Sequence, residues 1–287
     1  MIIAKIKIVT DSTADIPAEL LKENEISLIP LKVIFGENSY LENIEIQPQE
    51  FYEKLVSFEG IPTTSQPSPG EFYDCYQALT DDGSTVISLH LSSLMSGTIQ
   101  SARIAADLLK ERDITIIDSK LVSYALGCVV VVAAKAAKAG KSKAEILDII
   151  QKMIDNTQTY FIVDTLEYLK KNGRIGKASS LVGTMLNIKP VLTISDGQIA
   201  PFEKVRGKTK ALELIIKTAK EYQEEHGEIN CFVFYANNYP QALEFQQRLM
   251  SELNSEEILT GQIGAVVGTH GGPSMLALYF YKKALAE

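Results

Sequence analysis

Four short turns rich in hydroxyl side chains and glycine contain the residues of this chain that could do chemistry. They cover residues 63–69, 92–98, 172–174 and 268–273. Hydroxyl and backbone N–H groups bind anions, and a helix that follows such a turn adds its free N–H groups and its dipole. None of the turns contains a Walker lysine, a GxGxxG fingerprint or a zinc-ligand spacing. They therefore predict a site for a carboxylate or a phosphate that is held without a nucleotide motif.

The first two turns supply most of the hydroxyl groups. Thr64 and Ser65 lie in a run of three hydroxyl residues, followed by two prolines that stiffen the backbone. The second turn lies between an apolar segment and an expected helix, so Ser96 and the N–H groups of Gly97 and Thr98 are expected to face an anion. Turns of this composition can also serve only as connections, and the sequence leaves both interpretations open.

His270 and Arg174 are the two candidates among the basic residues. His270 is expected where an apolar strand ends and a final helix begins, among glycines that allow close backbone approach to a ligand. Arg174 lies between two glycines in a tight turn, whereas Lys170 and Lys171 fit a solvated helix end. A structural or surface role is the alternative for both candidates.

Asp11 follows the first expected strand, at the edge where open α/β sheets bind ligands. An aspartate there could act as a phosphotransferase nucleophile. The simpler interpretation is that Asp11 and Ser12 satisfy turn and cap hydrogen bonds before a helix that begins near Pro17.

Composition excludes several classes of protein. The chain has 287 residues, 46% of them hydrophobic, and a formal net charge of −8 without a cluster of lysine and arginine, which predicts no nucleic-acid partner. The N-terminus does not resemble a signal peptide, and the longest apolar run, 125–134, is shorter than the ~20 residues that cross a bilayer, so we expect a cytoplasmic protein. Three separated cysteines predict buried thiols rather than disulfides or a zinc site: Cys75, Cys128 and Cys231.

The elements that must position these residues alternate between strand and helix. This alternation predicts a two-domain α/β protein, with a mainly parallel N-terminal sheet covered by helices on both faces, and a boundary near residue 157 that gives domains 1–157 and 158–287. Expected strands cover 6–10, 26–35, 84–90 and 114–117. Expected helices cover 17–24, 48–58, 70–79, 96–110, 121–139 and 143–156, of which 121–139 is a buried helix despite its four valines.

The second half is expected to form a mixed sheet with helices, because residues 195–197 have the composition of a hairpin turn. Expected strands cover 160–163, 190–194, 198–205, 230–235 and 261–267. Expected helices cover 208–225 and 240–253.

Six short motifs, read in order along the chain, resemble the DegV family over about residues 6–281. The resemblance implies a two-domain α/β fold that binds a long-chain fatty acid between its domains. It also implies a binding subunit with no catalytic residue, metal or cofactor of its own, which presents the carboxylate to a separate ATP-dependent kinase subunit that makes acyl phosphate for phospholipid synthesis. Transient contact with a membrane surface for lipid exchange is a further implication. The motifs lie at 10–12, 64–67, 96–98, 118–119, 172–175 and 270–273.

The resemblance also assigns roles to residues. Thr64 and Ser96, with Ser65, Gly97 and Thr98 beside them, are implied to bind the carboxyl group. Arg174 and His270 are implied to flank the opening and to face the kinase or the phosphoryl group, His270 also reaching the carboxyl group. The chain departs from the family in one place, where Ser274 follows Gly272 and Pro273 instead of a glycine.

Two other functions remain open at this point. A self-contained hydrolase of acyl esters would use Ser96, His270 and Asp118 as a triad, although no GxSxG elbow is present. A phosphotransferase would act through Asp11, although a phosphate-loop lysine is missing. Acyl length and unsaturation depend on the shape of the pocket and do not follow from these motifs.

Overall fold

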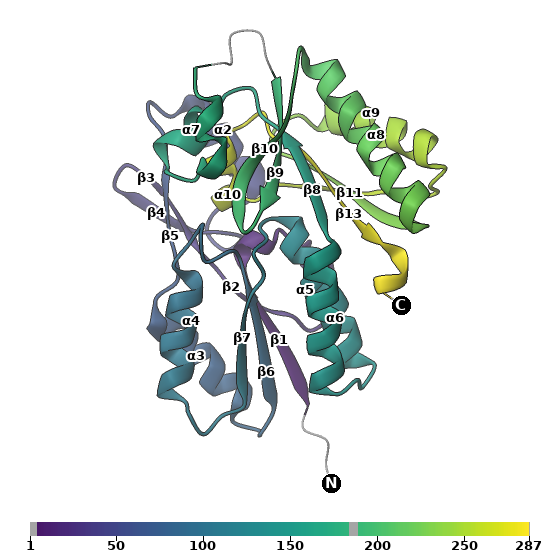
Figure 1. The fold of residues 1–287 in the computed structure, drawn as a ribbon. Helices are drawn as coiled ribbons and strands as arrows, with labels where there is room; N and C mark the ends of the chain where they lie inside the picture. The colour runs from purple at the N-terminus through teal and green to yellow at the C-terminus, as the bar shows by residue number, and fades with distance from the viewer. Residues whose placement is uncertain (1–4, 184–188, 287) are drawn as a thin grey trace.

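The structure is a computed structural model that describes residues 5–183 and 189–286. Within these residues the strands form three sheets (Figure 1). A parallel four-stranded sheet belongs to the first half of the chain, a mixed six-stranded sheet to the second half, and a small three-stranded antiparallel sheet lies beside them. The predicted α/β class, with a parallel sheet followed by a mixed one, is confirmed.

The parallel sheet is covered by helices on both faces because its central strands are apolar on both sides. In the first strand, Val9 packs with Phe72 on one face, and the neighbouring Ile8 packs with Val129 on the other. The strands, in the order β2-β1-β6-β7, are β1 (Ile6–Asp11), β2 (Ser27–Ile29), β6 (Thr85–His90) and β7 (Ile114–Asp118). The helices are α3 (Pro69–Thr80) and α4 (Thr98–Leu108) on one side, and the short α1 (Ala18–Glu23), α5 (Tyr124–Lys138) and α6 (Lys143–Asn156) on the other.

The helix predicted over 121–139 is present as α5 despite its valines. Every residue of the run Val129–Val132 is buried. A helix that is apolar all round is stable when neighbours cover all its sides, and burial then outweighs the weak helix propensity of valine.

The single strand predicted over 26–35 is wrong, because the chain changes sheet at Pro30. Proline has no N–H group to continue a strand ladder. Residues before it form β2 in the parallel sheet, and residues after it enter the small sheet, which packs with α2 (Pro48–Ser57). The strands of the small sheet are β3 (Lys32–Phe35), β4 (Asn38–Leu41) and β5 (Thr63–Ser65).

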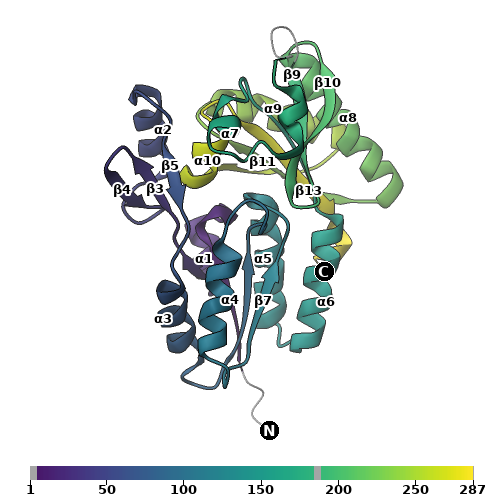
Figure 2. The ribbon, with the colours of Figure 1, turned by 60° about the vertical axis from the view of Figure 1, so that its left-hand side comes forward.

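The six-stranded sheet also has two different faces. In β8 (Gln158–Ile162), Tyr160 and Ile162 pack with the helices α8 (Lys208–His226) and α9 (Tyr239–Leu253). Phe161, which lies between them in the strand, joins the same core as α5. The two large sheets, which Figure 2 shows one above the other, therefore share one hydrophobic core. The sheet order is β10-β9-β8-β13-β11-β12, in which the other strands are β9 (Lys189–Ser195), β10 (Gln198–Val205), β11 (Ile229–Tyr235), β12 (Leu259–Gln262) and β13 (Leu276–Lys282).

The C-terminal segment differs from the prediction. Of the expected strand 261–267, residues 261–262 are the end of β12, but residues 265–267 begin the helix α10 (Ala265–Gly271). The expected final helix is the strand β13, which lies between β8 and β11. The segment contains two valines, which favour strand, and the groups that cap the helix come from distant parts of the chain. His270 consequently lies at the end of a helix rather than at the end of a strand.

The remaining predictions concern the connection between the halves and the cysteines. α6 ends at Asn156 and β8 begins at Gln158, and the hairpin predicted at 195–197 joins β9 to β10. All three cysteines are free thiols; Cys128 and Cys231 are buried as predicted, whereas Cys75 is only partly buried. No helix in the described residues combines the length and the apolar composition needed to cross a membrane.

Candidate functional site

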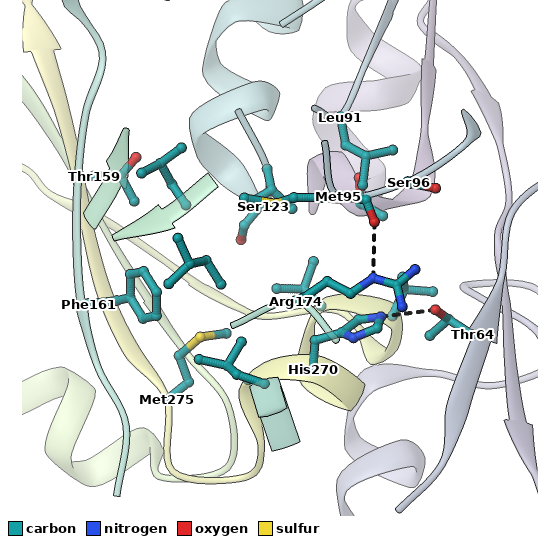
Figure 3. A pocket seen from close by; sticks show the side chains of 18 of the residues that line it. Thr64, Leu91, Met95, Ser96, Ser123, Thr159, Phe161, Arg174, His270 and Met275 are labelled. Carbon is teal, nitrogen blue, oxygen red and sulfur yellow. Dashed lines mark hydrogen bonds between the residues drawn. The ribbon is translucent and has the colours of Figure 1, made fainter. Parts of the chain in front are cut away.

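A pocket lies between the parallel sheet and the six-stranded sheet. It contains about 720 Å³ of empty space, counting the part that is open to solvent. Its wall is mainly apolar, with side chains such as Leu91, Phe161 and Met275. At one end four polar side chains gather, and we call them the polar cluster: Thr64, Ser96, Arg174 and His270 (Figure 3). The pocket thus combines a long apolar part with a hydrogen-bonding end.

Thr64 and His270, 206 residues apart in the sequence, share a hydrogen bond of 2.9 Å between Thr64 Oγ1 and His270 Nε2. Thr64 lies in β5 of the small sheet and His270 in α10. Burial, and to a smaller extent the positive charge of Arg174, lower the pKa of His270 to about 3. His270 is therefore neutral at physiological pH, with one ring nitrogen that donates and one that accepts. Its Nδ1 is buried without a hydrogen-bond partner in the described structure.

Arg174 follows the short helix α7 (Glu167–Lys171) and precedes η2 (Gly176–Leu181). Its Nε donates to the carbonyl oxygen of Met95 (3.0 Å), and its Nη1 donates to that of Asn172 (2.6 Å). No carboxylate in the described residues forms an ion pair with it. The guanidinium group is therefore fixed in place while its charge remains available to an anion.

The turn before α4 places one hydroxyl group in the pocket. Ser96 lines the pocket, and its Oγ shares a hydrogen bond of 2.9 Å with Thr98 Oγ1. Three other residues that the sequence singled out, Ser65, Gly97 and Thr98, do not line it. Thr98 is buried as the first residue of α4, so its hydroxyl group supports Ser96 rather than the pocket itself.

The hydrolase triad is not formed. His270 Nε2 bonds to Thr64 instead of Ser96, and no described carboxylate holds His270 Nδ1. Asp118 accepts the N–H groups of Ser93 (3.3 Å) and Lys120 (3.0 Å), which orders two turns. A catalytic triad needs the histidine to bridge the nucleophile and the carboxylate, and here it bridges neither.

Asp11 has a structural role, as the simpler interpretation predicts. It is fully buried, accepts from His90 Nδ1 (2.9 Å) and from the backbone N–H of Leu91 (3.1 Å), and caps the turn at Thr13. Asp11 does not line the pocket, and therefore cannot attack a ligand there.

Two residues that line the pocket were missed by the sequence analysis, and the structural role of a third, Asn172, was not foreseen. Met275 and Tyr279 line the pocket from β13 and the turn before it. The continuous run of apolar and aromatic residues in 276–281 was a usable signal for a buried strand. Asn172 donates to the carbonyl oxygens of Pro62 (3.3 Å) and Thr269 (3.0 Å), which ties three segments together. Nothing local to the sequence indicated that role.

Comparison with known proteins identifies the class of protein that this fold and pocket define. The model of the DegV family matches residues 5–283. Protein DegV of Bacillus subtilis is 36% identical over 274 residues, which cover 95% of this chain and 98% of that protein. The chain therefore belongs to the DegV family.

Solved structures of the family have the same fold. A DegV family protein from Thermus thermophilus, described by its fatty acid binding, has a TM-score of 0.91 at 35% identity, with 97% of this chain and 99% of that chain covered. DegV from Bacillus subtilis, described as a fatty acid binding protein, has a TM-score of 0.90 at 35% identity, with 98% and 100% covered. A stearic acid-binding protein from Eubacterium ventriosum has a TM-score of 0.90 at 28% identity, with 97% and 98% covered.

Proposed function

We propose that this protein binds a long-chain fatty acid, with the acyl chain in the apolar part of the pocket and the carboxylate at the polar cluster. The observation that carries the proposal is the mainly apolar pocket that ends at the polar cluster, where three uncharged hydrogen-bonding side chains accompany Arg174. Two related structures at 35% identity are described as fatty acid binding, which supports the same ligand class here.

The energetics support a fatty acid. Burying about 14 methylene groups at ~0.8 kcal/mol each gives about 11 kcal/mol before the costs of ordering the chain. The carboxylate then needs hydrogen bonds rather than a salt bridge. Thr64 and Ser96 have hydroxyl groups that can donate to it. When the proton of the neutral His270 is on Nε2, this N–H group donates to Thr64 Oγ1 and leaves the Thr64 O–H group free for the carboxylate.

We further propose that the bound carboxylate is presented to a separate ATP-dependent kinase subunit, which converts it to an acyl phosphate. Phosphoryl transfer depends on positioning and on positive charge near the transferred group. Arg174 supplies a fixed charge at the polar end of the pocket. Transfer of so apolar a ligand also favours a transient contact with a membrane surface.

Native mass spectrometry of the protein as purified from cells tests the ligand class. The expected result is a complex heavier than the bare chain by the mass of one fatty acid, which organic extraction removes and identifies. A protein that is free of lipid and does not bind added palmitate, stearate or oleate would contradict the proposal.

A further inference from the structure

Two buried carboxylic acids meet at the first residues of α10. Asp15 follows η1 (Ser12–Ala14), and Glu42 follows β4; their exposed fractions are 8% and 0%. Asp15 Oδ1 accepts from the backbone N–H of Gly264 (3.0 Å), and Glu42 Oε1 accepts from that of Val266 (2.7 Å). A Cβ atom on Gly264 would lie 2.5 Å from the Asp15 oxygen and 2.6 Å from the Glu42 oxygen. Asp15 and Glu42, which we call the carboxyl pair, therefore lie against one backbone position.

The carboxyl pair has no basic partner among the described residues. Asp15 Oδ2 accepts from Ser123 Oγ, and the Ser12 hydroxyl group lies beside Glu42, where it lowers the pKa of Glu42 without offsetting the effect of burial. The titratable groups around the pair are one more acid, Asp11, which is bonded to His90, and the phenols Tyr52 and Tyr279. Two adjacent carboxyl groups without a cation resist ionising together.

α10 connects the carboxyl pair to the polar cluster. Its first turn is held by Glu42, at the end of β4, and its last turn by Thr64, in β5 of the same small sheet. α10 is only seven residues long, and both its valines and its His270 line the pocket. A shift of its first turn is therefore transmitted to the His270–Thr64 hydrogen bond.

We propose that Asp15 and Glu42 are positioning residues for the polar cluster, and that a proton held by this pair keeps α10 in the arrangement that binds the carboxylate. Loss of the proton places a second negative charge in the buried pair. α10 then shifts, His270 separates from Thr64, and fatty acid affinity falls. The part of the inference that concerns affinity rests on the proposed function.

The protonation of the pair changes near neutral pH. Burial raises the pKa of Glu42 to about 7, and burial with the charge of Glu42 raises that of Asp15 well above its usual range. Below pH 7 the pair is protonated and α10 is held; above pH 7 Glu42 loses its proton. Affinity should therefore decrease as pH rises, by at most about tenfold per pH unit for one proton.

The binding test compares stearate affinity between pH 6 and pH 9 in the full-length protein and in Glu42→Gln. Glutamine can still accept from Val266 but cannot ionise. We expect the wild-type affinity to fall about tenfold over this range, and Glu42→Gln to lose this dependence. Glu53→Gln, an exposed acid of α2, is the control and should keep the wild-type pH profile. Identical profiles in wild type and Glu42→Gln would overturn the proposal.

A second measurement uses the ligand-free protein. The ring nitrogens of His270 can be followed by ¹⁵N NMR, since the chain has only three histidines. We expect the Nε2 signal to move with a midpoint near pH 7 in wild type and to stay constant in Glu42→Gln. The two proposals can be separated. If neither protein bound stearate, but the His270 Nε2 signal moved with pH in wild type and not in Glu42→Gln, the fatty acid proposal would fail and the positioning role would stand. A wild-type signal that did not move near pH 7 would overturn the positioning role.

Discussion

Arg174 is held by backbone carbonyl oxygens, and this distinguishes it from the other three members of the polar cluster. An arginine paired with a carboxylate would have its charge neutralised, whereas carbonyl oxygens orient the guanidinium group and leave the charge in place. Thr64, Ser96 and the neutral His270 add hydrogen bonds without charge. In this site the three uncharged side chains can form hydrogen bonds to a carboxylate, and Arg174 can attract a second anion by its charge.

Replacing Thr64 or Ser96 by alanine should weaken fatty acid binding without unfolding the protein. Losing one hydrogen bond to a charged group costs about 1.5–3 kcal/mol, or roughly 10- to 100-fold in the dissociation constant. Isothermal titration with stearate measures the change. Thr63→Ala, at the exposed neighbour in β5, is the matched control and should bind as wild type does. An unchanged affinity in the Thr64→Ala, Ser96→Ala double variant would exclude this carboxylate site.

Arg174→Ala should affect kinase turnover more than binding. We expect fatty acid affinity within a few-fold of wild type and a loss on the order of 10²-fold in acyl phosphate formation with the kinase subunit and ATP. Lys171→Ala, which removes an exposed lysine that pairs with Glu167, serves as the control. If Arg174→Ala lost affinity but kept its turnover at saturating fatty acid, Arg174 would instead be a ligand clamp.

The sequence could predict residues of the site, but not their contacts. The composition of the turns singles out Thr64, Ser96, Arg174 and His270, and all four line one pocket. Asp15 and Glu42 were missed because an acid that accepts from a helix N–H group normally lies next to that helix in the sequence. Here the acids lie 249 and 224 residues away from the groups that they accept from.

At the scale of the elements, α10 depends on its neighbours. Its sequence has little helix propensity, and Tyr52 packs directly against it. A Cβ atom on Gly268 would lie 2.5 Å from the Tyr52 hydroxyl oxygen and 2.8 Å from a ring carbon of Phe51. Both aromatic side chains are fully buried and have no room to move.

Gly268→Ala should therefore destabilise the protein by about 1–3 kcal/mol through overpacking. Urea unfolding measures the free energy. Gly70→Ala, in the helix α3, is the matched control, because a Cβ atom on Gly70 would meet only the Ser68 side chain, at 3.8 Å. Its expected change is neutral or slightly stabilising. A Gly268→Ala protein as stable as wild type would show that the Tyr52 and Phe51 side chains can move aside for the added methyl group.

Local patterns predicted the helices better than the strands around α10. Most helices of the first half lie where they were expected, because capping residues such as Ser142 and an apolar period mark them. The switch of sheets at Pro30 and the strand β13 were missed. Both depend on pairing with strands that are far away in the sequence, and a pattern of a few neighbouring residues does not contain that information.

At the scale of the whole molecule, Glu42 should make stability depend on pH. Between about pH 4.5 and pH 7 the folded chain keeps the Glu42 proton and the unfolded chain does not, so unfolding releases a proton and stability falls as pH rises. The change is at most about 3 kcal/mol. Urea unfolding measures the free energy of unfolding at pH 5 and at pH 8. Its decrease between these two pH values should be smaller in Glu42→Gln than in wild type. An equal decrease in both proteins would mean that Glu42 ionises normally.

The core shared by the two large sheets bears on how the protein can be dissected. The chain passes from one sheet to the other at residue 157, but the hydrophobic contacts do not divide there: Val129 belongs to the same cluster as Phe161 and Tyr279. A gene cut at that point would leave each fragment with an uncovered apolar face, and such faces aggregate. We therefore expect that the two halves, although consecutive in the chain, cannot be expressed or engineered as separate modules.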